Sequence, residues 1–178
     1  SAPRCAAWRG RTGAPRRVRM ALVVVDIADL AVAAEPGSSL ITYSLGSCIG
    51  LAIWDPVAHV GGMLHYMLPE SQLSPEKARS SPAMFCDTGV PRLFKAAYEL
   101  GAVKSRLVIK VAGGSQLLDD NGTFNIGKRN YLALRKIFWK NGVMISAENV
   151  GGSVSRTLKL DVDTGVVTVK SRNQEVPL

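Results

Sequence analysis

Short apolar runs separated by polar or glycine-rich turns dominate the chain, which is the pattern of a sheet-rich protein. The runs predicted to be strands are 23–34, 40–45, 49–54, 60–68, 107–112, 143–148, 155–162 and 166–170. Two turn signals, Asp55-Pro56 and Asp163-Thr164-Gly165, separate neighbouring runs, and the second predicts a hairpin.

The first helical signal is interrupted. Ser81 suits an N-cap and Pro82 suits the first helical position. Gly89 and Pro91 follow, and a proline inside a helix removes a hydrogen bond at a cost of ~3 kcal/mol. We therefore expect either a kink or two pieces, the second over 90–100.

The second helical signal is cleaner. The stretch 128–140 carries apolar residues at helical spacing, and Asn141-Gly142 marks its end. Without internal repeats or linkers, 20–178 is predicted to be one α+β domain. We expect a single layered α/β domain with a largely antiparallel β-sheet system and two main helices.

Charge is unevenly spread along the 178 residues, whose formal net charge is +8. Of the 22 basic residues, six are arginines within 1–19, a stretch without acids, so 16 face the 14 acidic residues of the remainder. The body is nearly neutral, which argues against a nucleic-acid-binding protein. The segment 1–19 is expected to be a disordered basic leader that adds little to the fold.

No targeting signal is predicted at the start of the body. Arg16-Arg17 and the apolar stretch 20–25 weakly resemble a twin-arginine signal, but Asp26 interrupts the apolar run. No run approaches the ~18 apolar residues that a membrane span needs. We expect a cytoplasmic protein that does not insert directly into a membrane.

The cysteines indicate reduced thiols rather than a disulfide framework. Cys5, Cys48 and Cys86 form an odd, sparse set without a CxxC pair, and only two histidines accompany them. No disulfide framework and no metal site are therefore expected. The chain also lacks the glycine-rich motifs of nucleotide sites, so no cofactor is implied.

One thiol has a candidate base. If the strands on either side of the Asp55-Pro56 turn pair through a four-residue loop that begins at Asp55, Cys48 lies directly opposite His65. Their Cβ atoms would then be ~4.5–5.5 Å apart, which suits proton transfer from thiol to imidazole. A loop one residue longer would put Tyr66 opposite Cys48 and turn His65 to the other face.

Other residues complete the candidate site. Thr42 lies on the preceding strand, and its hydroxyl or its carbonyl is placed to accept a hydrogen bond from the imidazole. Gly46 and Ser47 give the chain room to turn, and the backbone amides around Ser47 and Cys48 are candidates to face an oxyanion.

The residues alone leave a structural interpretation open. A lone cysteine in an apolar strand is usually a small core residue, and a lone histidine is usually a hydrogen-bonded structural one. Cys86 is expected to be structural, and His59, in the turn, is expected to face solvent.

Five blocks resemble the chemoreceptor glutamine deamidase family, CheD. The blocks are Thr42-Tyr-Ser-Leu-Gly-Ser-Cys-Ile-Gly50, Asp55-Pro-Val-Ala-His-Val-Gly-Gly-Met-Leu-His-Tyr-Met-Leu-Pro69, Lys110-Val-Ala-Gly-Gly-Ser115, Asn125-Ile-Gly-Lys-Arg-Asn130, and Glu148-Asn-Val-Gly-Gly152 followed by Arg156. The resemblance covers roughly 23–171 and fills the positions of a catalytic cysteine, histidine and threonine with Cys48, His65 and Thr42.

The resemblance implies a protein-glutamine deamidase that acts on chemotaxis receptors, with some members also cleaving receptor methyl esters. It implies a layered α/β fold similar to deamidating-toxin catalytic domains and a possible partner, a phosphatase of the CheC kind. The main alternative is a non-catalytic binding module that docks on receptor helices or on that phosphatase. A cysteine hydrolase of small amides is a further alternative.

Overall fold

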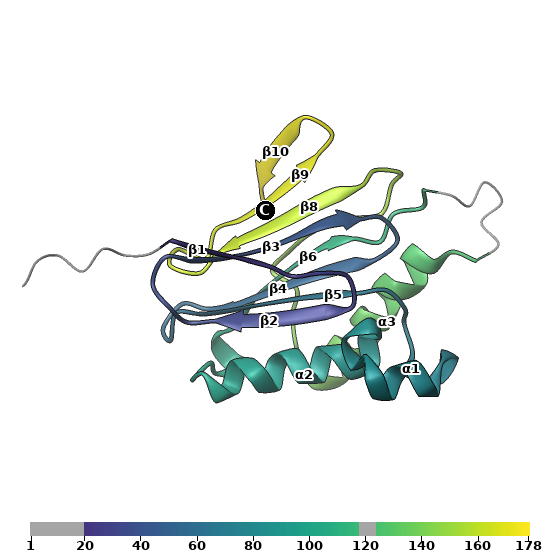
Figure 1. Cartoon of the computed structure of the whole chain (residues 1–178), viewed down its shortest axis with the longest axis horizontal. Coiled ribbons are helices and arrows are strands. Elements are labelled where there is room, and N and C mark those ends of the chain that lie inside the picture. Colours follow the sequence, from purple (N-terminus) through teal and green to yellow (C-terminus); the bar gives the residue numbers. More distant parts are fainter. Residues whose placement is uncertain (1–19, 118–123) are drawn as a thin grey trace, which may run out of the picture.

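The computed structural model describes residues 20–117 and 124–178, so the leader predicted over 1–19 lies outside them. Three layers are stacked in the described part (Figure 1): a sheet that we call sheet A, a second sheet B in the middle, and helices against the far side of sheet B. Among the described residues, Figure 1 shows no helix over the outer face of sheet A.

Sheet A has the order β1-β3-β8-β9-β10 and sheet B the order β2-β5-β4-β6-β7. The strands are β1 (Ala21–Val24), β2 (Asp29–Ala33), β3 (Ser38–Leu45), β4 (Ile49–Asp55), β5 (Val60–Tyr66), β6 (Val108–Gly113), β7 (Ala147–Val150), β8 (Arg156–Asp161), β9 (Val167–Ser171) and β10 (Gln174–Pro177). The α-helices are α1 (Pro75–Ser80), α2 (Cys86–Glu99) and α3 (Ile126–Asn141). Short 3-10 turns span Ser71–Leu73, Pro82–Met84 and Lys104–Arg106.

The expected mixed α/β architecture is confirmed. Neighbouring strands are antiparallel except for the pairs β1–β3 and β6–β7. The two longer helices, α2 and α3, are the two main helices that the sequence predicts, and the hairpin around Asp163-Thr164-Gly165 joins β8 to β9. The expected likeness to toxin catalytic domains stays a prediction.

The middle position of sheet B explains its apolar sequence. Every residue of β5 is buried, because one face of the strand packs on helices and the other on sheet A. Leu64 and Tyr66 join the core beneath α2 and α3, whereas Met63 joins the core between the sheets. A histidine at position 65 therefore points into the space between sheets A and B.

The prediction of one extended segment over 23–34 is wrong. The chain divides into β1 and β2, which belong to different sheets. Between them, Ala28 takes a left-handed conformation with φ 59°. This turn carries the chain from sheet A across to the edge of sheet B.

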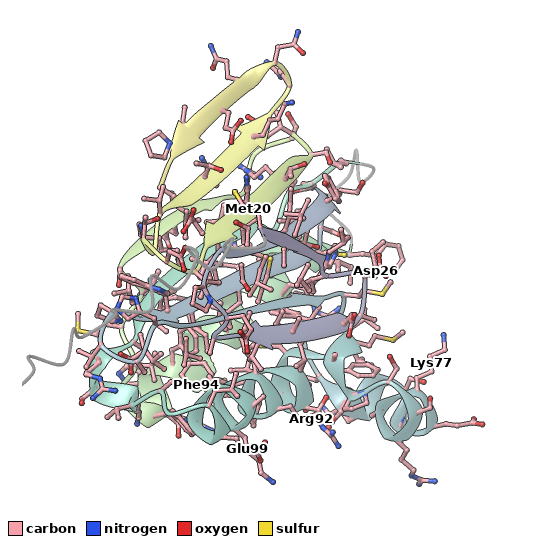
Figure 2. The ribbon with its side chains drawn as sticks, turned by 60° about the vertical axis from the view of Figure 1, so that its left-hand side comes forward. Met20, Asp26, Lys77, Arg92, Phe94 and Glu99 are labelled. Atoms are coloured by element: carbon pink, nitrogen blue, oxygen red, sulfur yellow. The ribbon has the colours of Figure 1, made fainter. Side chains whose placement is uncertain are left out.

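The prediction for the first helix is wrong in its bounds, and the alternative of two separate pieces is wrong as well. Ser81-Pro82 begins a 3-10 turn, and α2 starts only at Cys86 and runs through Pro91 to Glu99. Packing outweighs the lost hydrogen bond, because the side chains of α2 that face the sheet are buried. Figure 2 shows the opposite side of α2, where Arg92 and Glu99 point away from the sheet.

The start of α3 fits closely against the loop after β6. A Cβ at Gly127 would lie 2.4 Å from the carbonyl oxygen of Ser115 and 2.5 Å from that of Gly114. Only glycine allows this approach. The next turn of α3 is thereby brought to the segment that joins β3 to β4.

Candidate active site

The sequence-predicted residues come from both sheets. Thr42 lies on β3 of sheet A, and His65 lies on β5 of sheet B. Cys48 is half-buried in the bend that joins β3 to β4, directly before Ile49. The candidate site therefore bridges the gap between the two sheets at one end of the molecule.

The predicted register of β4 and β5 is wrong by two residues. His65 lies opposite Gly50, not opposite Cys48. The four-residue loop comprises 56–59 rather than the expected 55–58, because Asp55 is the last residue of β4 and pairs with Val60.

The side chain of Asp55 explains this shift. Its Oδ1 accepts hydrogen bonds from the amides of Val57 and Ala58, and its Oδ2 accepts one from the amide of Val103 and one from Arg106. Burial acts to raise the pKa of Asp55, but these hydrogen bonds outweigh it and hold the pKa below its usual range.

A shift of two residues preserves the face on which each side chain lies. Continuing the strand alternation backward from Gly50, Cys48 lies on the same face as Gly50 and His65, toward sheet A. It packs against the core between the sheets, as this face requires. Cys48 and His65 are thus diagonal neighbours, a relation in which Cα atoms are ~7–8 Å apart and long side chains still meet.

The contact between Thr42 and His65 links the two sheets. The Thr42 hydroxyl donates to the carbonyl oxygen of Val25 at 2.7 Å and lies 2.7 Å from Nδ1 of His65. A hydroxyl has a single proton, so the hydroxyl that donates to Val25 accepts from the imidazole. His65 accordingly carries its proton on Nδ1.

This tautomer leaves Nε2 of His65 with a free lone pair. Nε2 is buried, and no atom of the described residues hydrogen-bonds to it. Burial lowers the pKa of His65 to about 4, although the nearby Asp26 carboxylate acts in the opposite direction. The imidazole is therefore neutral at pH 7, with Nε2 able to accept a proton.

The thiol is also neutral in the resting site. Burial raises the pKa of Cys48 above its ordinary value of 9.0, and its own backbone amide opposes that effect. The site thus holds a neutral thiol and a neutral imidazole that are not hydrogen-bonded to each other, rather than a thiolate–imidazolium pair.

The three carbonyl groups of the bend are all occupied. The oxygen of Gly46 accepts from the amide of Ser115 at 2.8 Å, that of Ser47 from the Asn130 side chain at 2.9 Å, and that of Cys48 from the amide of Gly114 at 2.9 Å. In contrast, no carbonyl or side chain of another described residue accepts from the amides of Ser47 and Cys48, and the Cys48 amide contacts only its own thiol. Two adjacent amides that bond no other residue, beside a thiol, are an arrangement that suits an oxyanion.

The glycine pair at the end of β6, Gly113 and Gly114, does more than form a tight turn. Gly113 has φ 111°, and a Cβ there would lie 2.2 Å from the carbonyl oxygen of Cys48. The carbonyl of Gly113 accepts from the amide of Gly151, and this bond connects the glycine pair 113–114 to the glycine pair 151–152. Gly113 thus lets the backbone pass close to Cys48, a reason for glycine that the sequence alone did not supply.

Three buried polar residues support the loops and were not assigned a role from the sequence. Arg156 donates to Asn149 Oδ1 at 2.7 Å, to Ser115 Oγ at 2.6 Å and to the carbonyl of Gly151 at 2.8 Å. Ser115 Oγ in turn donates to the carbonyl of Val154. The third is Asn130. All three residues fall within or beside the sequence blocks that resemble the known family, and this position was the signal from which a role could have been inferred.

The remaining cysteine and histidine lie as expected. Cys86 is fully buried, where burial raises the pKa of its thiol to about 12. His59 is exposed in the turn before β5. Cys5 lies outside the described residues.

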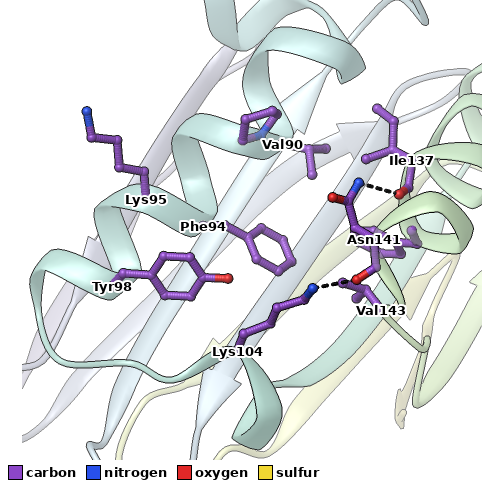
Figure 3. A pocket seen from close by; sticks show the side chains of 10 residues that line it. Val90, Phe94, Lys95, Tyr98, Lys104, Ile137, Asn141 and Val143 are labelled. Carbon is purple, nitrogen blue, oxygen red and sulfur yellow. Dashed lines mark hydrogen bonds between the residues drawn. The ribbon is translucent and has the colours of Figure 1, made fainter.

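The apolar pocket between α2 and α3 does not belong to this site. Its cavity volume is about 270 Å³, and Phe94, Tyr98 and Phe138 are among its lining residues (Figure 3). None of the predicted site residues lines it.

Among the described residues no group of three or more His, Cys, Asp or Glu side chains is placed to hold a metal ion. None of the helices described is long and apolar enough to cross a membrane.

Comparisons with known proteins identify a matching family model and several relatives of this chain. The model of the CheD family, described as CheD chemotactic sensory transduction, matches residues 67–171. A "probable chemoreceptor glutamine deamidase CheD 1" of Syntrophus aciditrophicus is 52% identical over 149 residues, which cover 84% of this chain and 93% of the relative. A protein of Solibacter usitatus, named "probable chemoreceptor glutamine deamidase CheD", is 46% identical over 159 residues, which cover 89% and 94%.

A relative of the same name from Thermococcus kodakarensis is 39% identical over 150 residues, which cover 83% of this chain and 91% of the relative. The family model spans more than half of this chain, and each of these relatives aligns with more than four-fifths of it. The chain belongs to the CheD family.

Proposed function

We propose that this protein hydrolyses the side-chain amide of glutamine residues on the cytoplasmic domains of chemotaxis receptors, leaving glutamate and ammonia. The names of its relatives support the reaction and the substrate. The observation that carries the proposal is the pair of hydrogen bonds at the Thr42 hydroxyl, because they orient His65 with its basic nitrogen unoccupied.

In the first half of the reaction, Cys48 Sγ attacks the glutamine Cδ while His65 Nε2 takes the thiol proton. Proton removal accompanies attack, because both groups are neutral at rest. The amides of Ser47 and Cys48 donate to the oxygen that becomes negative in the tetrahedral intermediate. The C–N bond then breaks, and the imidazolium returns its proton to the departing ammonia.

In the second half, His65 takes a proton from a water molecule that attacks the thioester. The C–S bond breaks, glutamate forms, and the thiol of Cys48 is regenerated. Thr42 holds the imidazole through Nδ1 in both halves. A neutral hydroxyl stabilises the imidazolium less than a carboxylate does, so we expect slow turnover.

The same acyl chemistry extends to the methyl esters of receptor glutamates, with methanol as the leaving group in place of ammonia. We place the protein in the cytoplasm, where these receptor domains lie, and propose a phosphatase of the CheC kind as a partner. A binding module without catalysis is the competing function, and the experiment below separates the two.

The experiment follows glutamine-to-glutamate conversion in a receptor cytoplasmic fragment by peptide mass. Wild-type protein should convert specific glutamines, and the variants Cys48→Ala and His65→Ala should each abolish conversion about as fully as the double variant, since the two act as a unit. Cys86→Ala is the matched control and should convert normally. Sustained conversion by Cys48→Ala would refute the nucleophile, and binding without conversion by wild type would favour the binding module.

A further inference from the structure

Asn130 joins the chain that carries Cys48 to the chain that carries His65. Its side-chain nitrogen donates one hydrogen to the carbonyl of Ser47 at 2.9 Å and the other to the carbonyl of Met67 at 2.8 Å. The last rung of the β4–β5 ladder is the pair Ile49–Tyr66. Asn130 thus bridges the two strands just beyond the point where their own hydrogen bonding ends.

The bond to Ser47 fixes the direction of the neighbouring amide. A trans peptide group is planar, and its C=O and N–H point in opposite directions. The described residues contain no cis peptide bond. Holding the Ser47 carbonyl toward Asn130 therefore turns the amide of Cys48 away from Asn130. The amide of Ser115 acts on the Gly46 carbonyl in the same way and so directs the amide of Ser47.

The placement of Asn130 is tightly determined. It lies on α3 one turn after Gly127, whose close approach sets the helix against the Gly114–Ser115 loop. The hydroxyl of Tyr66 donates to its main-chain carbonyl at 2.8 Å.

Its side-chain nitrogen is fully used, whereas no described residue donates to its buried Oδ1. Leaving a buried oxygen unpaired disfavours folding, so packing alone does not account for an asparagine here.

We propose that Asn130 is a positioning residue that orients the amides of the Cys48 loop toward the developing oxyanion. The inference rests on the proposed acyl-transfer function and extends it to a residue that touches neither substrate nor thiol. The proposed role of Asn130 predicts different effects on two reactions of the Cys48 sulfur. Attack on a carbonyl passes through an oxyanion and needs oriented amides, whereas displacement of iodide from iodoacetamide does not.

The test compares these two reactions at Cys48, scored by peptide mass on the full chain. The probes are p-nitrophenyl acetate, which acetylates the thiol and releases p-nitrophenolate, and iodoacetamide, which alkylates it and releases iodide. Asn130→Ala removes both donors, and Asn130→Leu removes them while keeping a side chain of similar size and branching. The matched control is Asn141→Ala on the same helix (Figure 3), where the amide bonds only the exposed carbonyl of Ile137.

Asn130→Ala should lower the acetylation rate about 10-fold or more, since loss of one oxyanion donor reduces rates by ~10²–10³ and here the donors are displaced rather than deleted. The alkylation rate should stay within about 2-fold to 3-fold of wild type. Asn141→Ala should leave both rates unchanged. If the alanine variant does not fold, the leucine variant gives the same comparison, because it fills the same space without burying a charge.

Equal losses in both reactions, or no loss in acetylation, would overturn the positioning role. A wild-type protein that resists acetylation at Cys48 would overturn it as well. Neither probe involves a receptor, so the outcomes separate cleanly from the proposed function. Failure to convert receptor glutamines, with the acetylation difference intact, would refute the substrate but not the role of Asn130.

Discussion

At the scale of single residues, the Thr42 hydroxyl decides the chemistry available to His65. The sequence left open whether the hydroxyl or the carbonyl of Thr42 meets the imidazole, and the structure assigns the hydroxyl. Because the same hydroxyl donates to Val25, the side chain specifies both the orientation and the tautomer of the ring. Its removal should therefore affect catalysis rather than folding alone.

Replacing Thr42 tests this assignment. Thr42→Val keeps the shape but removes the acceptor, so the deamidation rate should fall about 10-fold or more, a part of the ~10²–10⁴-fold that general-base catalysis supplies. Thr42→Ser keeps the hydroxyl and should retain most of the rate. The measurement is initial glutamine conversion by each variant. Equal rates for valine and serine would remove the side chain from the mechanism.

Thiol reactivity gives a second test at this scale. Cys48 is half-buried and Cys86 is fully buried with a pKa of about 12, so iodoacetamide should alkylate Cys48 much faster near neutral pH. The raised pKa of Cys48 means that its rate should rise steadily from pH 7 to pH 9. His65→Ala should slow the reaction at pH 7. Indistinguishable rates for the two thiols would contradict the assignment.

The buried imidazole also predicts a pH-dependent stability. The unfolded chain takes up a proton at His65 below its ordinary pKa of 6.5, whereas the folded protein does so only below about 4. The free energy of unfolding should thus fall as the pH drops through this interval, by about 2 kcal/mol between pH 7 and pH 5. Urea unfolding at both pH values should show this loss for wild type, and a loss smaller by that amount for His65→Gln.

At the scale of elements, strand positions were predictable and their pairing was not. Alternation, turn residues and apolar runs located most strands and the α3 helix, because these signals are local. The register of β4 and β5 depends on the buried Asp55 and its contacts with Val103 and Arg106, which come from a distant segment. Cys48 and His65 still share a face because the error of two residues preserves the alternation.

The loop roles were beyond local signals for the same reason. The sequence shows Gly113 only as a glycine, while its requirement comes from the carbonyl of Cys48 in the bend before β4. Likewise, an asparagine inside a helix shows no sign of its partners. Asn130 acquires a role only when α3 packs beside the Cys48 loop.

Comparison of Gly113 with Gly101 tests the role of the close approach between Gly113 and the Cys48 carbonyl. Gly113 and Gly101 have similar positive φ angles, 111° and 101°, but a Cβ at Gly101 would meet nothing within 4 Å. Substitution by alanine should strain both backbones by at least ~1–2 kcal/mol. Only Gly113→Ala should displace the Cys48 carbonyl, so it alone should lower deamidation about 10-fold or more. Equal activities of the two folded variants would show that the contact with Cys48 does not matter.

At the scale of the whole molecule, the candidate site depends on how the two sheets pack. Thr42 belongs to sheet A and His65 to sheet B, so their 2.7 Å contact is made only when the sheets are correctly seated. The core between the sheets is separate from the core beneath the helices. A cavity in the first should therefore disturb the site more than a cavity in the second.

Two leucines allow a matched comparison. Leu158 lies opposite Thr42 in the core between the sheets, and Leu93 of α2 lies in the core beneath the helices; both are fully buried. Leu158→Ala and Leu93→Ala should each lower the free energy of unfolding by about 2–5 kcal/mol. Under conditions where both are folded, Leu158→Ala should show the larger loss of deamidation. A larger loss for Leu93→Ala would indicate that the helix layer controls the site.

The occupied carbonyls and free amides of the Cys48 bend have a consequence for hydrogen–deuterium exchange. The amides of Gly114 and Ser115 are engaged and should exchange slowly, although they lie in a loop. The amides of Ser47 and Cys48 bond no other described residue and should exchange quickly, although their carbonyls are firmly held. Rapid exchange is ordinarily taken as a sign of local motion. In this bend, two fast amides between slow neighbours would instead be the signature of a rigid backbone that keeps its donors available.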